Sequence, residues 1–94
     1  MMAKLFNDQT SAGVSQSSES QGSFASLLAK GTWGGALLAV EVSPDAGTTW
    51  LTTDVQLTSD GIKNFISGRG VTYRLVLTGT TGTTNVNAWL TYQS

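Results

Sequence analysis

The sequence contains neither cysteine nor histidine among its 94 residues. Their absence excludes disulfide bonds, thiolate nucleophiles, zinc sites built from these residues and an imidazole base. Charge is also sparse, because five Lys and Arg stand against six Asp and Glu, a formal net charge of −1. The longest apolar run, Ala36–Val40, is too short to span a bilayer. We therefore expect no nucleic-acid partner, no membrane partner, no metal and no cofactor.

The six carboxylates are the remaining groups that could support catalysis, and they are scattered singly along the chain. Glycoside hydrolysis needs two carboxylates on either side of one bond, and a Ser–Lys mechanism needs a lysine beside its nucleophile. The spacing of the acids indicates no such pair. We predict that the protein is not an enzyme.

Hydroxyl side chains are abundant instead, with 14 Thr and 11 Ser beside 11 Gly and a single Pro. Threonine favours strands through its β-branch, and glycine marks turns. No stretch keeps a helical spacing for ten residues, and short segments separated by turn signals are expected to be strands at 24–29, 36–42, 49–54, 55–58, 62–66, 71–78 and 85–92. The sequence predicts an all-β fold, a small antiparallel β-sandwich or jelly-roll of about six to eight strands.

Two further turns are expected to close hairpins. Asp60-Gly61 is a dipeptide typical of hairpin turns, so residues 55–58 and 62–66 are expected to pair with each other. The Gly- and Thr-rich segment 79–84 is expected to be a plain hairpin turn before the last strand.

One turn has a more specific sequence. Residues 43–50 carry the pattern Ser-x-Asp-x-Gly-x-Thr-Trp, which matches the Asp-box hairpin of sialidases and other β-proteins. Pro44 presets the backbone for a turn, and the Asp side chain can accept hydrogen bonds from the backbone ahead of it. We expect a folding element and not a ligand site, built by Ser43, Asp45, Gly47, Thr49 and Trp50.

The first 22 residues differ from the rest of the chain. Residues 11–21 are mostly Ser, Gln and Gly, and the strong apolar anchors before them are Leu5 and Phe6. A mobile polar tail, an arm that pairs with a neighbouring subunit, and an edge strand followed by a loop all fit this composition. We divide the chain into an N-terminal arm or edge segment at 1–22 and a β-sandwich domain at 23–94.

Two tryptophans and two arginines are candidates for partner contacts. Trp33 lies in a Gly-rich turn, where it either stacks on a sugar or a partner or caps one end of the sandwich. Trp89 shares a strand face with polar residues, which fits a subunit interface or a half-buried site beside a long side chain. Arg69 lies between two glycines, whereas Arg74 is expected to pair with an acid such as Glu41. The candidate contact residues are Leu5, Phe6, Trp33, Arg69 and Trp89.

Several of these stretches resemble small structural proteins of tailed bacteriophages. The resemblance rests on residues 31–36, 42–50, 73–79 and 85–90, and it covers about Gly22 to Leu90. It implies a head decoration (cement) protein on the outer surface of the phage head, which stabilises the head through contacts with the major capsid protein. Independently of the resemblance, a domain of this size with exposed strand edges and an apolar arm is expected to form a homo-oligomer, with a trimer favoured. The alternative is a carbohydrate- or receptor-binding module of a tail or head fibre, with Trp33 stacking on a host glycan.

Overall fold

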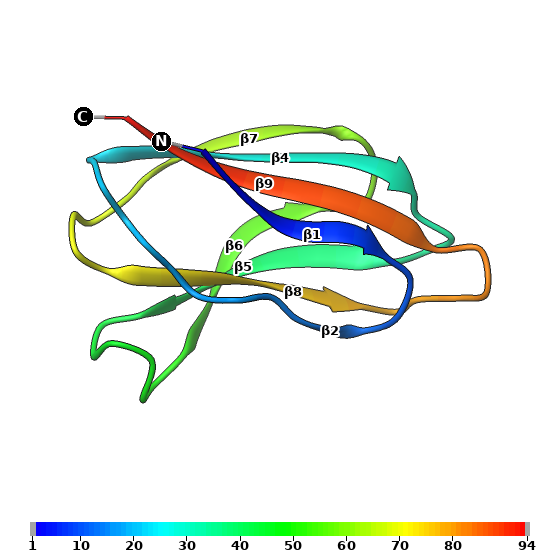
Figure 1. Cartoon of the computed structure of the whole chain (residues 1–94), viewed down its shortest axis with the longest axis horizontal. Helices are drawn as coiled ribbons and strands as arrows, with labels where there is room; N and C mark the ends of the chain where they lie inside the picture. The colour runs from blue at the N-terminus through cyan, green and yellow to red at the C-terminus, as the bar shows by residue number, and fades with distance from the viewer. Residues whose placement is uncertain (1, 94) are drawn as a thin grey trace.

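The computed structural model describes residues 2–93, which form two antiparallel sheets packed on each other (Figure 1). Sheet A has the strand order β1-β9-β4-β7, and sheet B has the order β2-β8-β5-β6 with β3 also paired to β8. The predicted all-β sandwich is confirmed, and no helix in this part of the chain could cross a membrane. The strands are β1 Met2–Gln9, β2 Gly13–Val14, β3 Ser18–Glu19, β4 Phe24–Thr32, β5 Leu37–Ser43, β6 Leu51–Leu57, β7 Gly61–Ile66, β8 Thr72–Thr78 and β9 Asn85–Gln93.

The order of pairing is that of a jelly-roll. The short strands β2 and β3 lie along the same edge of β8, and between them Ser15 bonds the main chain of Leu75, so they act as one interrupted strand. Counted in this way, the first strand pairs with the last and the second with the last but one, followed by β4 with β7 and β5 with β6. This nested pairing is that of a long antiparallel hairpin wound into two sheets. Successive strand pairs belong alternately to sheet A and sheet B.

The core lies between the sheets because each long strand turns alternate side chains inward. On β4 the inward positions are Ala25, Leu27 and Ala29. Each fully buried leucine contributes roughly 1.5–3 kcal/mol relative to exposure. The largest of the fully buried side chains are Leu27, Leu38, Leu75, Leu77 and Leu90.

Residues 2–22 supply edge strands to both sheets of this unit. β1 pairs with β9, and Phe6 is 3 % exposed within the core, with Leu5 packed partly against the same cluster. The edge-segment alternative matches this arrangement. A mobile tail or an arm reaching a neighbour does not, because an inward-facing phenylalanine completes the chain's own core.

The two hairpins expected at 59–61 and 79–84 are wrong, because both turns cross between sheets. Residues 51–57 form one strand of sheet B, whereas β7 lies in sheet A; β8 and β9 are divided in the same way. Turn residues specify a reversal of the chain but not the sheet that receives it. Long-range bonds select the crossing: Asp60 accepts from the Gly31 N–H, and the Thr81 hydroxyl donates to the Gly34 carbonyl.

Every sheet edge carries a feature that hinders pairing with a further strand. The register of β1 on β9 breaks twice between residues 4 and 9, and that of β6 on β5 breaks once. On β7, Lys63 stands opposite Leu27 in the inward-facing column, and the β2–β3 edge is interrupted at 15–17. Bulges and inward-pointing charges are devices that protect edges. Partner contacts are therefore more readily made through the sheet faces.

Candidate binding surface

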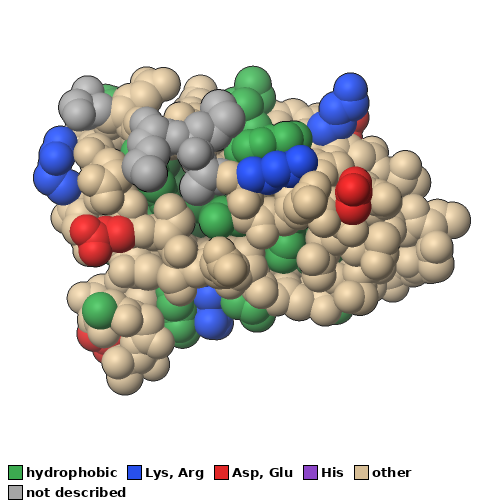
Figure 2. Space-filling model, viewed as in Figure 1, with side chains coloured by type: hydrophobic (Ala, Val, Ile, Leu, Met, Phe, Trp, Pro, Cys, Tyr) green, Lys and Arg blue, Asp and Glu red, His purple; other side chains and the backbone are tan. Residues whose placement is uncertain are grey.

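The outer face of sheet A brings the most accessible apolar residues together. In the sheet register, Trp89 of β9 stands between Lys4 of β1 and Leu28 of β4, and Leu28 stands opposite Ile62 of β7. We call these four residues the tryptophan row. Hydrophobic and cationic side chains lie beside one another along the upper part of Figure 2, where Figure 1 shows β4 and β7.

A second apolar pair lies at the other end of the same face. Phe24 and Ile66 are register partners and are 55 % and 80 % exposed, and we call them the apolar corner. Ser26 and Asn64 stand between the corner and the tryptophan row, and their side chains bond each other. The face is therefore divided into two apolar regions separated by a polar one.

An open hollow of about 380 Å³ lies at the tryptophan row. Its apolar floor and polar rim come from β4, β7, β9 and the β6–β7 turn. The Lys4 ammonium lies 5.1 Å from the centroid of the Trp89 ring, within cation–π range. The residues that line the hollow are Leu28, Ala29, Lys30, Asp60, Gly61, Ile62 and Trp89.

Asp60 is fixed at the rim by two hydrogen bonds. Its Oδ1 accepts from Trp33 Nε1 at 2.9 Å and from the Gly31 N–H at 2.9 Å. These bonds, with the Trp33 bond the larger, lower the pKa of the Asp60 carboxyl below its usual range, and Lys30 adds to the effect. The group is therefore a carboxylate near neutral pH, and the hydrogen bonds from Trp33 and Gly31 fix its orientation.

The three tryptophans differ in what their indole N–H groups do. Trp33 is buried and donates to Asp60, so the alternative in which it caps one end of the sandwich matches the structure. Trp50 donates to the Gly47 carbonyl at 3.1 Å. Trp89 is half-buried, and no residue of 2–93 accepts a hydrogen bond from its indole. Only this tryptophan retains an N–H for a ligand or for solvent.

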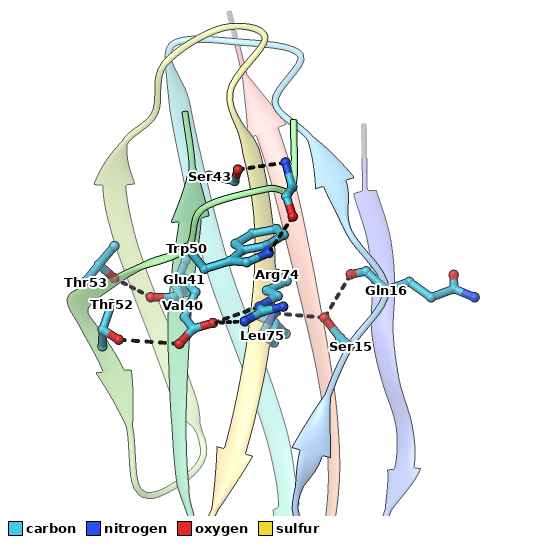
Figure 3. Close-up of polar contacts among 11 residues, drawn as sticks. Ser15, Gln16, Val40, Glu41, Ser43, Trp50, Thr52, Thr53, Arg74 and Leu75 are labelled. Carbon is cyan, nitrogen blue, oxygen red and sulfur yellow. Dashed lines mark hydrogen bonds and ion pairs between the residues drawn. The ribbon is translucent and has the colours of Figure 1, made fainter. Parts of the chain in front are cut away.

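The outer face of sheet B carries a closed cluster (Figure 3). Arg74 Nη2 and Nε each lie 2.7 Å from Glu41 Oε1, which confirms the predicted pairing of these residues. The guanidinium carbon lies 4.1 Å from the centroid of Trp50, and the Thr52 hydroxyl donates to Glu41 Oε2. Each charged group of the cluster thus has a partner within it.

The β5–β6 hairpin is formed by the residues of the Asp-box pattern, and it projects from one end of the sandwich (Figure 1). Ser43 is 1 % exposed, and its Oγ accepts from the Gly47 N–H at 2.7 Å. Asp45 Oδ1 accepts from the Thr49 N–H at 2.7 Å and from the Ser43 hydroxyl at 2.9 Å. These contacts are all local, as expected of a folding element.

The predicted contact residues are not gathered at one place. Arg69 is exposed in the β7–β8 loop and Trp89 lies on the outer face of sheet A, whereas Phe6 and Trp33 are buried in the core. The apolar corner and the rest of the hollow were not predicted from the sequence. A detectable signal existed, because Phe24 and Leu28 share a strand face with Ser26 and therefore lie on the polar side of β4.

No protein-family model, curated protein or solved structure matches this chain. Residues 2–93 contain no group of three or more acidic, His or Cys side chains placed to hold a metal ion. The surface is therefore interpreted from its own geometry.

Proposed function

We propose that the protein is a non-enzymatic structural component of a phage virion that decorates the capsid on the outer surface of the head. In this role it binds the major capsid protein and stabilises the head through contacts between subunits. The proposal draws on the resemblance of residues 31–36, 42–50, 73–79 and 85–90 to phage structural proteins. The jelly-roll pairing is compatible with it, since capsid and lectin domains use the same architecture.

The observation that carries the proposal is the apolar corner. Phe24 and Ile66 lie side by side on a sheet face and expose more than half of their surface. Burial of either side chain against a partner contributes up to roughly 1.5–3 kcal/mol. Contiguous apolar surface of this kind marks protein contacts, and the protected edges make strand addition a poorer route. Attachment is therefore assigned to this corner and not to an N-terminal arm.

Self-association is part of the same proposal. A sandwich of this size is only marginally stable alone and gains stability when copies bind one another through surface other than the apolar corner, and a closed trimer is the simplest ring of that kind. Light scattering over a concentration series measures the state directly. A monomer throughout the series, with or without added capsids, contradicts the oligomeric part.

Co-sedimentation with undecorated phage capsids tests the attachment. The double variant Phe24→Ser, Ile66→Ser is expected to weaken capsid binding by at least about tenfold while the protein remains folded. Val14→Ser is the matched control, because Val14 is 53 % exposed but lies on sheet B. Undiminished binding by the double variant, or no binding by the wild type, overturns the proposal.

A further inference from the structure

We propose that the hollow at the tryptophan row is a saccharide-binding site, which holds one sugar ring against Trp89 and favours a ring that bears a carboxylate. The site lies on the same sheet face as the apolar corner but at its opposite end, across the polar Ser26–Asn64 pair. Its assignment rests on the hollow alone and is independent of the capsid role.

The first reason is the unused capacity of Trp89. A tryptophan that contributes only to the fold normally has a partner for its N–H, as Trp33 and Trp50 do. Trp89 has none among the described residues, yet it lies next to the apolar side chains of Leu28 and Ile62. Its indole supplies one donor, and the exposed Lys4 ammonium lies over one ring face, so a sugar stacks on the other face or displaces the Lys4 side chain.

The second reason is the chemistry of the rim. Asp60 is oriented through Oδ1, and no described residue donates to its Oδ2, which remains available as an acceptor. The Lys30 side chain is exposed at the same rim and supplies donors. A ligand that satisfies this site is apolar on one side and carries donors and acceptors around its edge. A pyranose ring has that distribution, with C–H bonds on its faces and hydroxyls at its periphery.

The third reason separates a sugar from a peptide. An extended peptide binds a sheet through free main-chain groups at an edge. Trp89 and Leu28 lie on β9 and β4, which are interior strands paired on both sides, so their main chains offer nothing to a peptide. Recognition at this position has to come from side chains. Lys4 and Lys30 together outnumber Asp60, which favours a ring with a carboxylate over a neutral one.

The test is binding of defined oligosaccharides, with hexagalacturonate as the acidic probe and cellohexaose as the neutral one, measured by calorimetry. The wild type is expected to bind the acidic probe more tightly, and Trp89→Ser is expected to weaken binding at least about tenfold. Trp89→Phe should recover part of the affinity, because it keeps an aromatic face. Lys30→Met should reduce the preference for the acidic probe.

Ile66→Ser is the matched control, because Ile66 is exposed on the same face and lies outside the hollow. It should bind both probes as the wild type does, and near-ultraviolet circular dichroism checks that each variant is folded. Failure of the wild type to bind either probe at millimolar concentration, or wild-type affinity in Trp89→Ser, overturns the site. The capsid role is judged separately, since Trp89→Ser should still co-sediment with capsids.

Discussion

The outer faces of the two sheets each place a tryptophan beside a cation. The polar groups around the tryptophan are all paired on sheet B, whereas on sheet A the indole N–H has no partner among residues 2–93. On sheet B, Trp50 covers Arg74, Arg74 is paired to Glu41, and the indole N–H is bonded to Gly47. On sheet A, Trp89 has Lys4 at 5.1 Å, its N–H is unused, and a hollow lies beside it. A half-buried tryptophan therefore indicates a binding site only after its polar group and its neighbours have been accounted for.

The charges follow the same division between the sheets. All three lysines of the chain lie on strands of sheet A, which carry one acid, Asp8. The strands of sheet B carry three acids and a single arginine. The small net charge of the whole chain thus conceals two faces of different sign, which matters for partners that approach within a Debye length. The acids of the sheet B strands are Glu19, Glu41 and Asp54.

The largest expected change in the free energy of unfolding distinguishes a substitution on the core face of sheet A from one on its outer face. Phe6→Ala removes a core side chain that is 3 % exposed, and it should lower the free energy of unfolding by about 3 kcal/mol or more. Phe24→Ala, on the outer face, should change it by no more than about 0.5 kcal/mol. Urea unfolding followed by circular dichroism measures both. A comparable loss from the two variants would mean that the apolar corner serves the fold.

The same contrast implies that β1 cannot be removed without damage. Its deletion strips a paired strand from β9 and takes Phe6 out of the core. A chain of this length has only a marginal stability, on the order of 5–15 kcal/mol, with which to compensate. The shortened protein should therefore be unfolded by urea at much lower concentration than the full chain.

Local patterns in the sequence predicted those features that depend on neighbouring residues. The strand at 24–29 was predicted with Ala25 and Leu27 on one face, and the turn at 43–50 formed its hairpin through bonds within the turn. The pairing of Arg74 with an acid such as Glu41 was predicted from opposite charge alone, and the register of β8 on β5, which the sequence does not show, places the two residues opposite each other.

Features that depend on the register between distant strands could not be predicted in this way. Trp89 could be identified from its polar strand neighbours, but the hollow requires Leu28 and Ile62 from two other strands. The two wrong hairpins have the same cause. The partner of the Asp60 side chain is Trp33, 27 residues away, and nothing in the turn itself specifies it.

Replacing each of the two outer tryptophans by alanine should destabilise the protein to different extents. Trp50→Ala uncovers Arg74 and removes the bond to the Gly47 carbonyl, so it should lower the free energy of unfolding by about 2 kcal/mol. Trp89→Ala should cost less than about 1 kcal/mol, because its indole is not hydrogen-bonded and faces an open hollow. Thermal and urea unfolding of the two variants decide the matter. A larger loss from Trp89→Ala would assign the hollow to the fold.

The smallest effect concerns Asp45 and depends on pH. Hydrogen bonds from the side chain and backbone of Thr49 lower the pKa of the Asp45 carboxyl below 3.8. A carboxyl whose pKa is lower in the folded state stabilises the fold above its unfolded pKa, and that contribution is lost as the pH falls through the folded value. Asp45→Asn should therefore melt at a slightly lower temperature than the wild type near neutral pH. The difference should begin to shrink as the pH falls through the unfolded pKa of about 4, and it should disappear below the lowered folded pKa, where the carboxyl is protonated in both states.

Scanning calorimetry at several pH values measures this difference. Asp54→Asn is the control for the loss of one negative charge, because Asp54 is exposed on β6 and lies outside the hairpin. The control should follow the wild type over the whole pH range. A pH-independent drop in Asp45→Asn would show that the hairpin depends on the shape of the side chain and not on its charge. In that case the neutral amide oxygen of Asn would accept the same hydrogen bonds as the carboxylate, and the hairpin would be expected to tolerate Asn at this position.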